Sequence, residues 1–293
     1  MAHMAHFELP DGRLNGDGLD NTEKPPALLV EPDQPKLIRL RNAANWTLGA
    51  PWDGLVIGKM KDVANKSDRL IEVTAKQPGM TTIEAKSRDG RSAIQLTVYA
   101  RPLLKHKIAF YFVRDDGGHK TRRADADGSK ILQRVNEIYS SQANIKFEQI
   151  DLRNITIPGD LGPEVDLPEG QKAGPEFMAI ANATEPMQFD PIKALDQASH
   201  ARIRVHFVWK LSRKASGNKD IEGAGTIGGD VLLVEDNVAA NVGDVVAHEI
   251  GHCLGLNHDD CKNGWLMCPT TQQFGTIIPK RHVDILNPTP PNK

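Results

Sequence analysis

The stretch HEIGHCLGLNHD, residues 248–259, decides how the rest of this chain is interpreted. His248 and His252 lie four positions apart, and on an α-helix this spacing places two imidazoles one above the other on one face. Both side chains can therefore reach a single metal ion, for which histidine nitrogen is a common ligand. Glu249 lies beside them but outside the ligand row, where its carboxylate can take a proton from water at the metal.

His258 lies six residues after His252, too far along the chain to stay on the same helical face. Gly255 stands where the helix has to end, and glycine adopts the left-handed backbone conformation of such ends at little cost. A turn there brings His258 back to complete a set of three nitrogens, with a fourth position open for water. By composition alone, the full pattern H-E-x-x-H-x-x-G-x-x-H would arise in roughly one such sequence in ten thousand. A purely structural histidine cluster is the alternative, and the full pattern disfavours it.

These residues resemble the zinc signature of the metzincin metalloendopeptidases. That family has a methionine in a tight turn beneath the metal, and the segment GWLMCP supplies Met267. The resemblance covers most of residues 105–290. It implies one Zn²⁺ per chain, held by the three histidines, and a cleft between an upper lobe of twisted sheet and helices and a small lower lobe that begins after Gly255.

Features around this signature point to different subfamilies. Asp259, directly after the third histidine, is similar to the reprolysins, whereas the short link to LMCP and the segment IGGD at 227–230 look more like the matrixins. Matrixins carry a histidine for a second, structural zinc where this chain has Leu232, so that site is doubtful. Pro269 stands where astacins and serralysins have a tyrosine, and no upstream cysteine of the kind that keeps matrixins latent is found.

The three cysteines all lie near the end of the chain. Cys253 falls on the apolar stripe of the predicted helix, where a buried thiol is the default. Cys261 and Cys268 flank the link to the methionine turn; a disulfide between them and two unpaired thiols are both open. The remaining histidines are expected to be surface or packing residues: His106, His119, His200, His206 and His282.

The first hundred residues have a different pattern. Residues 1–24 are polar and rich in Gly, Asp and Asn, which predicts a flexible tail. Residues 25–101 alternate apolar and polar side chains between turn signals, which predicts a small β-sandwich. Its segment QPGMTTIEAKS resembles bacterial immunoglobulin-like repeats. Such a domain could bind a surface or a protein partner, or it could be a spacer.

Residues 102–293 are expected to form the peptidase domain, and the change of pattern at 100–104 predicts that the two parts can be separated there. Strands are predicted at 107–113, 145–150, 202–211 and 225–235, with helices at 128–142 and over the histidine stretch. The segment 151–199 is expected to be a long excursion with one short helix. The fold class is therefore multi-domain: an all-β immunoglobulin-like sandwich followed by an α/β (α+β) domain of the metzincin type.

Composition limits the partners. The chain has 36 basic and 38 acidic side chains, so no overall field favours nucleic acid or an anionic membrane. No apolar run approaches the roughly 18 residues that span a bilayer. A signal peptide is not visible in this chain; the resemblance nevertheless suggests a secreted, extracellular protein.

The sequence thus favours a zinc-dependent endopeptidase that acts on a protein or peptide substrate, with Glu249 as general base and then general acid. Gly255, Asp259 and Met267 are expected to support the site. Two alternatives remain: a surface-binding protein whose zinc site is vestigial, and a secreted, toxin-like effector with a narrow substrate range.

Overall fold

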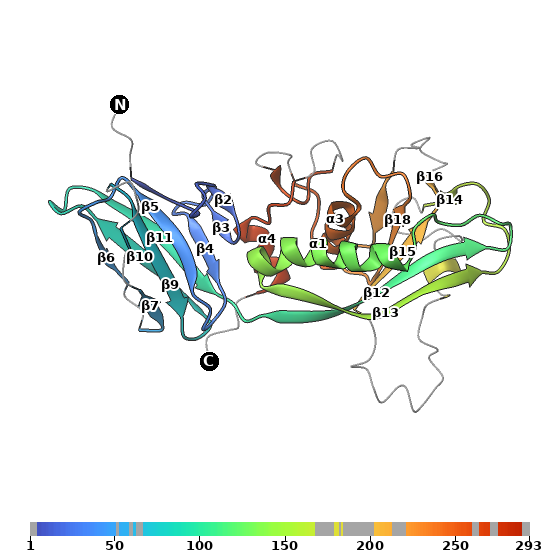
Figure 1. Ribbon diagram of the computed structural model, residues 1–293, viewed down its shortest axis with the longest axis horizontal. Helices are drawn as coiled ribbons and strands as arrows, with labels where there is room; N and C mark the ends of the chain where they lie inside the picture. Colours follow the sequence, from blue (N-terminus) through green and yellow to red (C-terminus); the bar gives the residue numbers. More distant parts are fainter. Residues whose placement is uncertain are drawn as a thin grey trace. The chain divides into compact units, whose positions relative to one another are not determined.

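The computed structural model describes residues 5–50, 53–58, 61–62, 67–167, 179–181, 183, 202–212, 221–259, 264–269 and 275–288 (Figure 1). Contacts divide the chain into two compact units. The first comprises Met1–Leu104, Ile138–Ile145 and Ile277–Lys293, and the second Lys105–Glu137 and Lys146–Thr276. The first unit thus gathers residues from both sides of the boundary predicted at 101, and the domain limits given above stay a prediction.

The first unit is built around two β-sheets. One has the order β1-β5-β9-β7 with β8 beside β9, and the other has the order β2-β3-β4-β11-β10-β6. Their strands are β1 (His6–Glu8), β2 (Asn15–Gly16), β3 (Leu19–Asp20), β4 (Ala27–Val30), β5 (Lys36–Arg41), β6 (Thr47–Gly49), β7 (Leu55–Ile57), β8 (Lys61–Asp62), β9 (Arg69–Ala75), β10 (Gly79–Lys86) and β11 (Ala93–Ala100).

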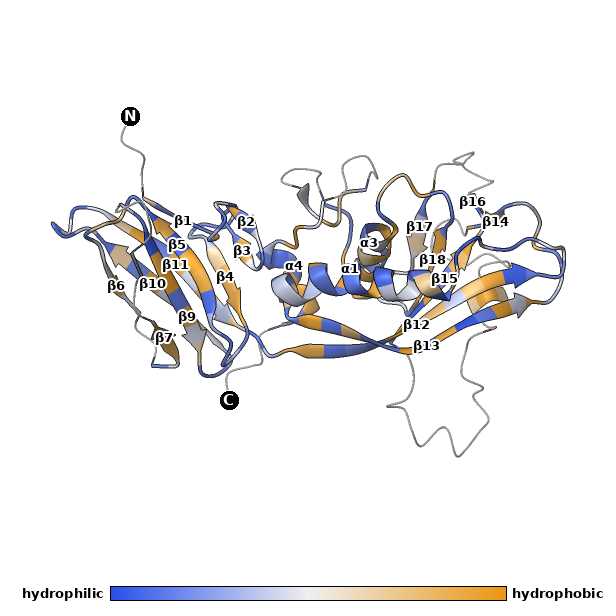
Figure 2. Cartoon of the chain, in the orientation of Figure 1, coloured by the Kyte–Doolittle hydropathy of each residue, from blue (hydrophilic) through white to orange (hydrophobic). Residues whose placement is uncertain are grey.

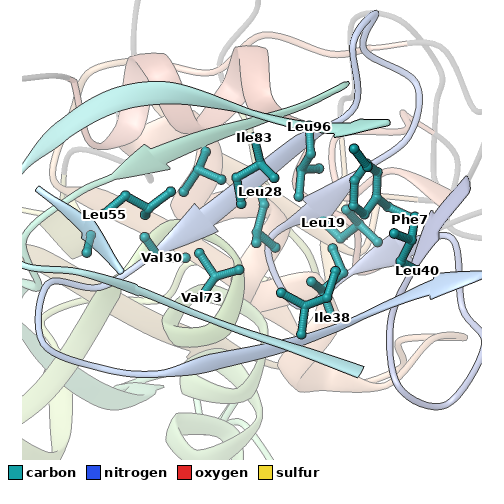
Figure 3. Close-up of a cluster of buried hydrophobic side chains, with 14 of the residues drawn as sticks. Phe7, Leu19, Leu28, Val30, Ile38, Leu40, Leu55, Val73, Ile83 and Leu96 are labelled. Carbon is teal, nitrogen blue, oxygen red and sulfur yellow. The ribbon is translucent and has the colours of Figure 1, made fainter. Parts of the chain in front are cut away.

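The two sheets enclose one hydrophobic core. Every second residue of β9 is buried, and the same alternation runs along β10, as expected for strands with one face toward a core. Ile83 and Leu96 from one sheet face Ile38 and Val73 from the other (Figure 3). Alternating hydrophobic and hydrophilic colouring of these strands is visible in Figure 2. The predicted β-sandwich is therefore present.

The beginning of the chain differs from the flexible tail predicted for residues 1–24. Strands β1, β2 and β3 fall within that stretch, and Phe7, Leu9 and Leu19 are buried in the sandwich core. The prediction rested on the polar and glycine-rich composition and gave no weight to these three apolar side chains. Burial of each stabilises the segment by about 1.5–3 kcal/mol.

The second unit contains a five-stranded sheet with the order β13-β12-β15-β18-β17. Strands β12, β15 and β18 run parallel, and β17 is antiparallel to β18 at one edge. A short parallel pair, β14 and β16, lies apart from this sheet. The bounds are β12 (Leu104–Asp115), β13 (Ile145–Ile157), β14 (Val165–Asp166), β15 (Ile203–Val208), β16 (Leu211–Ser212), β17 (Gly223–Gly225) and β18 (Val231–Glu235).

All residues of β15 and β18 are buried, as in parallel strands covered on both faces. The single strand predicted at 225–235 is in fact two strands joined by a turn. Gly228 has a positive φ of 70° in that turn, and the Gly229 N–H donates to the Thr226 carbonyl. The glycines that the sequence pattern placed at the opening of one strand therefore form the reversal between two.

Three helices have described bounds: α1 (Asp125–Ala143), α3 (Val242–Cys253) and α4 (Lys280–Leu286). Helix α3 packs on β15, β17 and β18, and Arg134 of α1 forms an ion pair with Asp244 in the first turn of α3 at 2.6 Å. Within the described ranges, no helix is long and apolar enough to cross a membrane. The excursion predicted at 151–199 begins later than expected, because residues 151–157 continue strand β13 and 165–166 form β14; residues 179–181 are helical, and 168–178, 182 and 184–199 lie outside the described residues.

Buried polar contacts join the parts of the first unit. Asn144 follows α1 directly, and its Nδ2 donates to the carbonyls of Val30 at 3.1 Å and Arg101 at 2.9 Å. The guanidinium of Arg101, 3% exposed as a residue, pairs with Asp284 of α4. A chain that begins at Leu103 would remove both carbonyl acceptors of Asn144 and the Arg101 partner of Asp284, so we expect separation at 100–104 to cost stability.

Asn144→Ala should lower the free energy of unfolding by about 1–3 kcal/mol, because the carbonyls of Val30 and Arg101 each lose the hydrogen bond that the buried Asn144 side chain donates. Alanine must also adopt the left-handed conformation of this residue, whose φ is 50°. Asn42→Ala is the control for the backbone effect. Asn42 has a similar φ of 52°, and it donates its backbone N–H, which alanine keeps, to the Asp68 carboxylate. Chemical denaturation that finds equal losses for the two variants would contradict the role of the Asn144 side chain.

Candidate metal centre

The histidine stretch forms the second half of α3 and the turn that follows. Asn241 caps the helix by accepting from the Gly243 N–H at 2.8 Å, and every residue from Val245 to Cys253 is buried. The i, i+4 spacing therefore has the helical geometry that the sequence predicts. His248 and His252 lie on the buried part of this helix, 2% and 7% exposed.

The chain reverses at Gly255, which has a positive φ of 99°. The Gly255 N–H donates to the His252 carbonyl at 2.8 Å, and the Leu256 N–H donates to the Gly251 carbonyl at 2.9 Å. These bonds pair carbonyls at the end of the helix, and the His252 carbonyl also accepts from the Gly228 N–H at 2.9 Å. The turn predicted at this glycine is present, and it directs the following residues back toward the helix.

This turn brings the three histidines together. The ring centroids lie 4.9 Å apart for His248 and His252, 5.3 Å for His248 and His258, and 4.7 Å for His252 and His258. The Nε2 atoms of His252 and His258 are 3.1 Å apart. One ligand atom from each histidine lies within 4.8 Å of the other two, a spacing that one ion can bridge.

Two of the rings are oriented from behind by backbone carbonyls. His248 Nδ1 lies 2.8 Å from the Leu266 carbonyl, and His252 Nδ1 lies 2.8 Å from the Leu256 carbonyl. A carbonyl oxygen can only accept, so Nδ1 carries the proton and Nε2 keeps a lone pair. Outward hydrogen bonds of this kind are the usual support of metal-ligating histidines.

Burial keeps these rings neutral. It lowers the pKa of His248 to about 3, with a smaller opposing effect from the hydrogen bond to Leu266. Burial also lowers the pKa of His252, against a hydrogen bond to Leu256 that raises it. A neutral imidazole with a free Nε2 lone pair is the form that binds zinc. The donor set and its protonation therefore fit a Zn²⁺ ion.

The segment with the predicted methionine turn lies against this site. Met267 is fully buried, and its carbonyl accepts from the Asp259 N–H at 2.8 Å. Its neighbour Leu266 supplies the carbonyl that orients His248. Asp259 and Met267, two of the three residues expected to support the site, thus connect the turn after the third histidine to the segment whose Leu266 carbonyl contacts His248.

Glu249 is 6% exposed and lies against the edge strand β17. A Cβ at Gly223 would come within 2.8 Å of Glu249 Oε1, and a Cβ at Gly225 within 2.7 Å of the Glu249 carbonyl oxygen. Only glycine leaves this space free. Neither glycine could be recognised from the sequence, because nothing in their spacing shows which helix residue they face.

The other cysteine and histidine predictions have mixed outcomes. Cys253 is a buried free thiol, as expected, and burial raises its pKa to about 12. Cys268 is disulfide-bonded, whereas Cys261 lies outside the described residues. His206 is fully buried and packs on Tyr111, with ring centroids 5.1 Å apart, which confirms its packing role.

The remaining histidines match the predicted surface or packing role in two cases and differ from it in one. His282 is buried and His106 packs against Phe147, both as expected. His200 lies outside the described residues. His119 differs, because it contacts the carboxylates of Asp115 and Asp160. Leu232, at the position of the doubtful second zinc ligand, is fully buried in β18.

Comparison with known proteins gives one family. The matrixin family model of peptidases matches residues 105–284. A search of curated proteins found no match to the chain.

Solved structures give only distant likenesses. A cysteine protease inhibitor from Entamoeba histolytica is 22% identical, with a TM-score of 0.23, over 26% of this chain and 85% of its own. Domains 4 and 5 of the S-layer protein SbsC are 18% identical, with a TM-score of 0.20, over 25% of this chain and 46% of theirs.

Gly225→Ala should lower the free energy of unfolding by about 1–3 kcal/mol, because its Cβ would meet the backbone of Glu249 rather than a flexible side-chain end. Gly49→Ala on β6 is the matched control, since nothing lies within 4 Å of a Cβ added there. Chemical denaturation of both variants measures the difference. Equal stabilities would show that β17 has room to move away from α3.

Proposed function

The chain belongs to the matrixin family of peptidases, and from this membership we propose that it hydrolyses internal peptide bonds as a zinc-dependent endopeptidase. The observation that carries the proposal is the convergence of His248, His252 and His258, with two Nε2 atoms 3.1 Å apart and Glu249 on the same helix. The three histidines would hold one Zn²⁺. Bound zinc would supply Lewis-acid chemistry, polarising a peptide carbonyl and lowering the pKa of water.

Glu249 is the residue that moves protons in this proposal. Its carboxylate accepts a proton as water attacks the peptide carbonyl, and it then donates that proton to the leaving amine as the C–N bond breaks. The low exposure of Glu249 and its close packing on β17 restrict where the carboxylate can lie. A carboxylate held in place loses less conformational freedom during the reaction than a mobile one would.

We further propose that an extended substrate adds as a strand beside β17. The edge strand on this side of the sheet is Gly223–Gly225, which within the described residues pairs only with β18. Its free side offers backbone N–H and C=O groups to a peptide. Main-chain hydrogen bonds would then give affinity, and side-chain pockets would give selectivity.

The substrate is therefore proposed to be a protein or peptide, not a nucleic acid. Matrixins typically act outside the cell, and we propose a secreted location for this chain as well. We also propose that the N-terminal sandwich is immunoglobulin-like, with a surface or protein partner as its ligand. The intact Glu249 argues against a vestigial site, because loss of the base is the simplest way to lose activity.

Glu249→Ala should remove nearly all peptidase activity, because general acid–base catalysis contributes about 10²–10⁴-fold and this residue acts twice. Zinc content and the circular dichroism spectrum should stay unchanged, since the three ligands remain. Glu137→Ala on α1 is the control, because Glu137 is an exposed glutamate of another helix. A Glu249→Ala chain that retains more than roughly a tenth of the native rate would exclude this residue as the base.

His252→Ala should lower the zinc content by one equivalent per chain, because the remaining two histidines hold the ion weakly. Elemental analysis of the dialysed protein measures the change. His106→Ala, outside the cluster, should leave the content as it is. An unchanged ratio in the His252→Ala chain would remove the ligand assignment.

A further inference from the structure

A second group of metal-ligating side chains lies in the second unit. Asp115 ends β12, His119 follows it by one tight turn, and Asp160 belongs to the turn after β13. Among the described residues, this set and the three histidines are the groups in which three ligand atoms lie within 4.8 Å of one another. The matrixin signature uses none of these three residues.

The distances between the atoms are those of ligands on one ion. His119 Nδ1 lies 3.0 Å from an oxygen of Asp115 and 3.3 Å from an oxygen of Asp160. Ligands about 2.0–2.2 Å from one metal at tetrahedral or octahedral angles are separated by roughly 3.0–3.5 Å. One ring nitrogen carries at most one proton, so a hydrogen bond from it can satisfy only one of the two carboxylates fully.

The Asp115 carboxylate is built into the fold. Its side chain is fully buried, and it accepts from the His119 N–H at 2.8 Å and the Leu161 N–H at 2.9 Å. Burial acts to raise the pKa of Asp115, but these hydrogen bonds and the His119 ring outweigh it and lower the pKa below its usual value. These contacts hold the carboxylate in place, with one oxygen 3.0 Å from His119 Nδ1.

The other two side chains are positioned from outside the cluster. The His119 ring stacks on Trp209 with centroids 5.5 Å apart and planes at 24°, and Trp209 Nε1 donates to the Gly162 carbonyl at 3.1 Å. The Gly162 N–H donates to Asp160 at 2.8 Å. Gly117 leaves the space that the Asp160 carboxylate fills, because a Cβ there would lie 2.4 Å from Asp160 Oδ1.

The two turns that carry these residues are also joined to each other. The Asp116 N–H donates to the Gly159 carbonyl at 3.0 Å, and the Gly159 N–H returns to the Asp116 carboxylate at 2.9 Å. The ligands therefore come from a preformed pair of turns. The exposed side of the cluster, where the Asp160 side chain is 64% and that of His119 30% accessible, leaves water free to complete the coordination.

We propose that Asp115, His119 and Asp160 bind a second divalent cation of the zinc or manganese class, which ties the end of β12 to the turn after β13. One imidazole with two carboxylates suits these ions better than Ca²⁺, which prefers oxygen ligands alone. The cation has a structural role, because the site lies in a different part of the unit from Glu249 and shares no ligand with the three histidines.

The test uses the full chain, equilibrated with zinc at a buffered micromolar free concentration, and measures bound zinc by elemental analysis. The native chain should hold two zinc ions, Asp160→Asn one, His252→Ala one, and the double variant none. Asp160→Asn is preferred because its side chain is exposed and the amide oxygen can still accept from Gly162. Asp151→Asn is the matched control, since that carboxylate pairs with Arg153 on β13 and should leave two ions bound.

Zinc should also raise the unfolding temperature of the His252→Ala chain, and this rise should be lost when Asp160→Asn is added. Equal zinc content in the native and Asp160→Asn chains, or stabilisation of the His252→Ala chain by calcium but not by zinc, would overturn the proposal. The zinc lost in His252→Ala tests the histidine site alone, and the zinc lost in Asp160→Asn tests the second site alone. A negative result for one site therefore leaves the result for the other valid.

Discussion

The imidazoles of His248 and His252 each direct Nδ1 at a backbone carbonyl, at 2.8 Å from Leu266 and from Leu256. Each bond is worth only about 0.5–1.5 kcal/mol to folding. Their larger effect is on orientation, because they turn both Nε2 lone pairs toward one point. Both carbonyls come from chain beyond the helix, so the ligand geometry depends on how the segments 254–259 and 264–267 lie against it. Loss of such supporting bonds typically lowers metal affinity about 10–100-fold.

That fold-back rests on a second constraint, the close packing of α3 on the sheet. The helix is buried along its whole second half, and β17 approaches it so closely that a Cβ at 225 would meet the Glu249 backbone and one at 223 would meet the Glu249 side chain. The same packing buries the histidine rings and holds them neutral, since burial lowers the pKa of both His248 and His252. The close packing of α3 on β17 therefore has two effects. It keeps the histidine ligands neutral, and it restricts the position of the Glu249 carboxylate.

Much of the site could be predicted from the sequence because its spacing is local. The four-residue step between the two helical histidines and the glycine seven residues after the first are properties of a single helix and its end. The glycines of β17 could not be found in this way, since a strand glycine has many uses and its partner on α3 is 24 or more residues away. The cluster of Asp115, His119 and Asp160 joins two turns some 40 residues apart. These turns come together because β12 and β13 are neighbours in the sheet, which the sequence pattern does not show.

The central claim is that this chain cleaves peptides by means of the metal that its three histidines hold. Cleavage of a broad peptide library, profiled by mass spectrometry before and after removal of zinc with a chelator, tests it most directly. We predict defined cleavage sites in the native protein, their loss on chelation and their return when zinc is added back. Cleavage that persists without zinc, or no cleavage by the fully loaded native chain, would contradict the account.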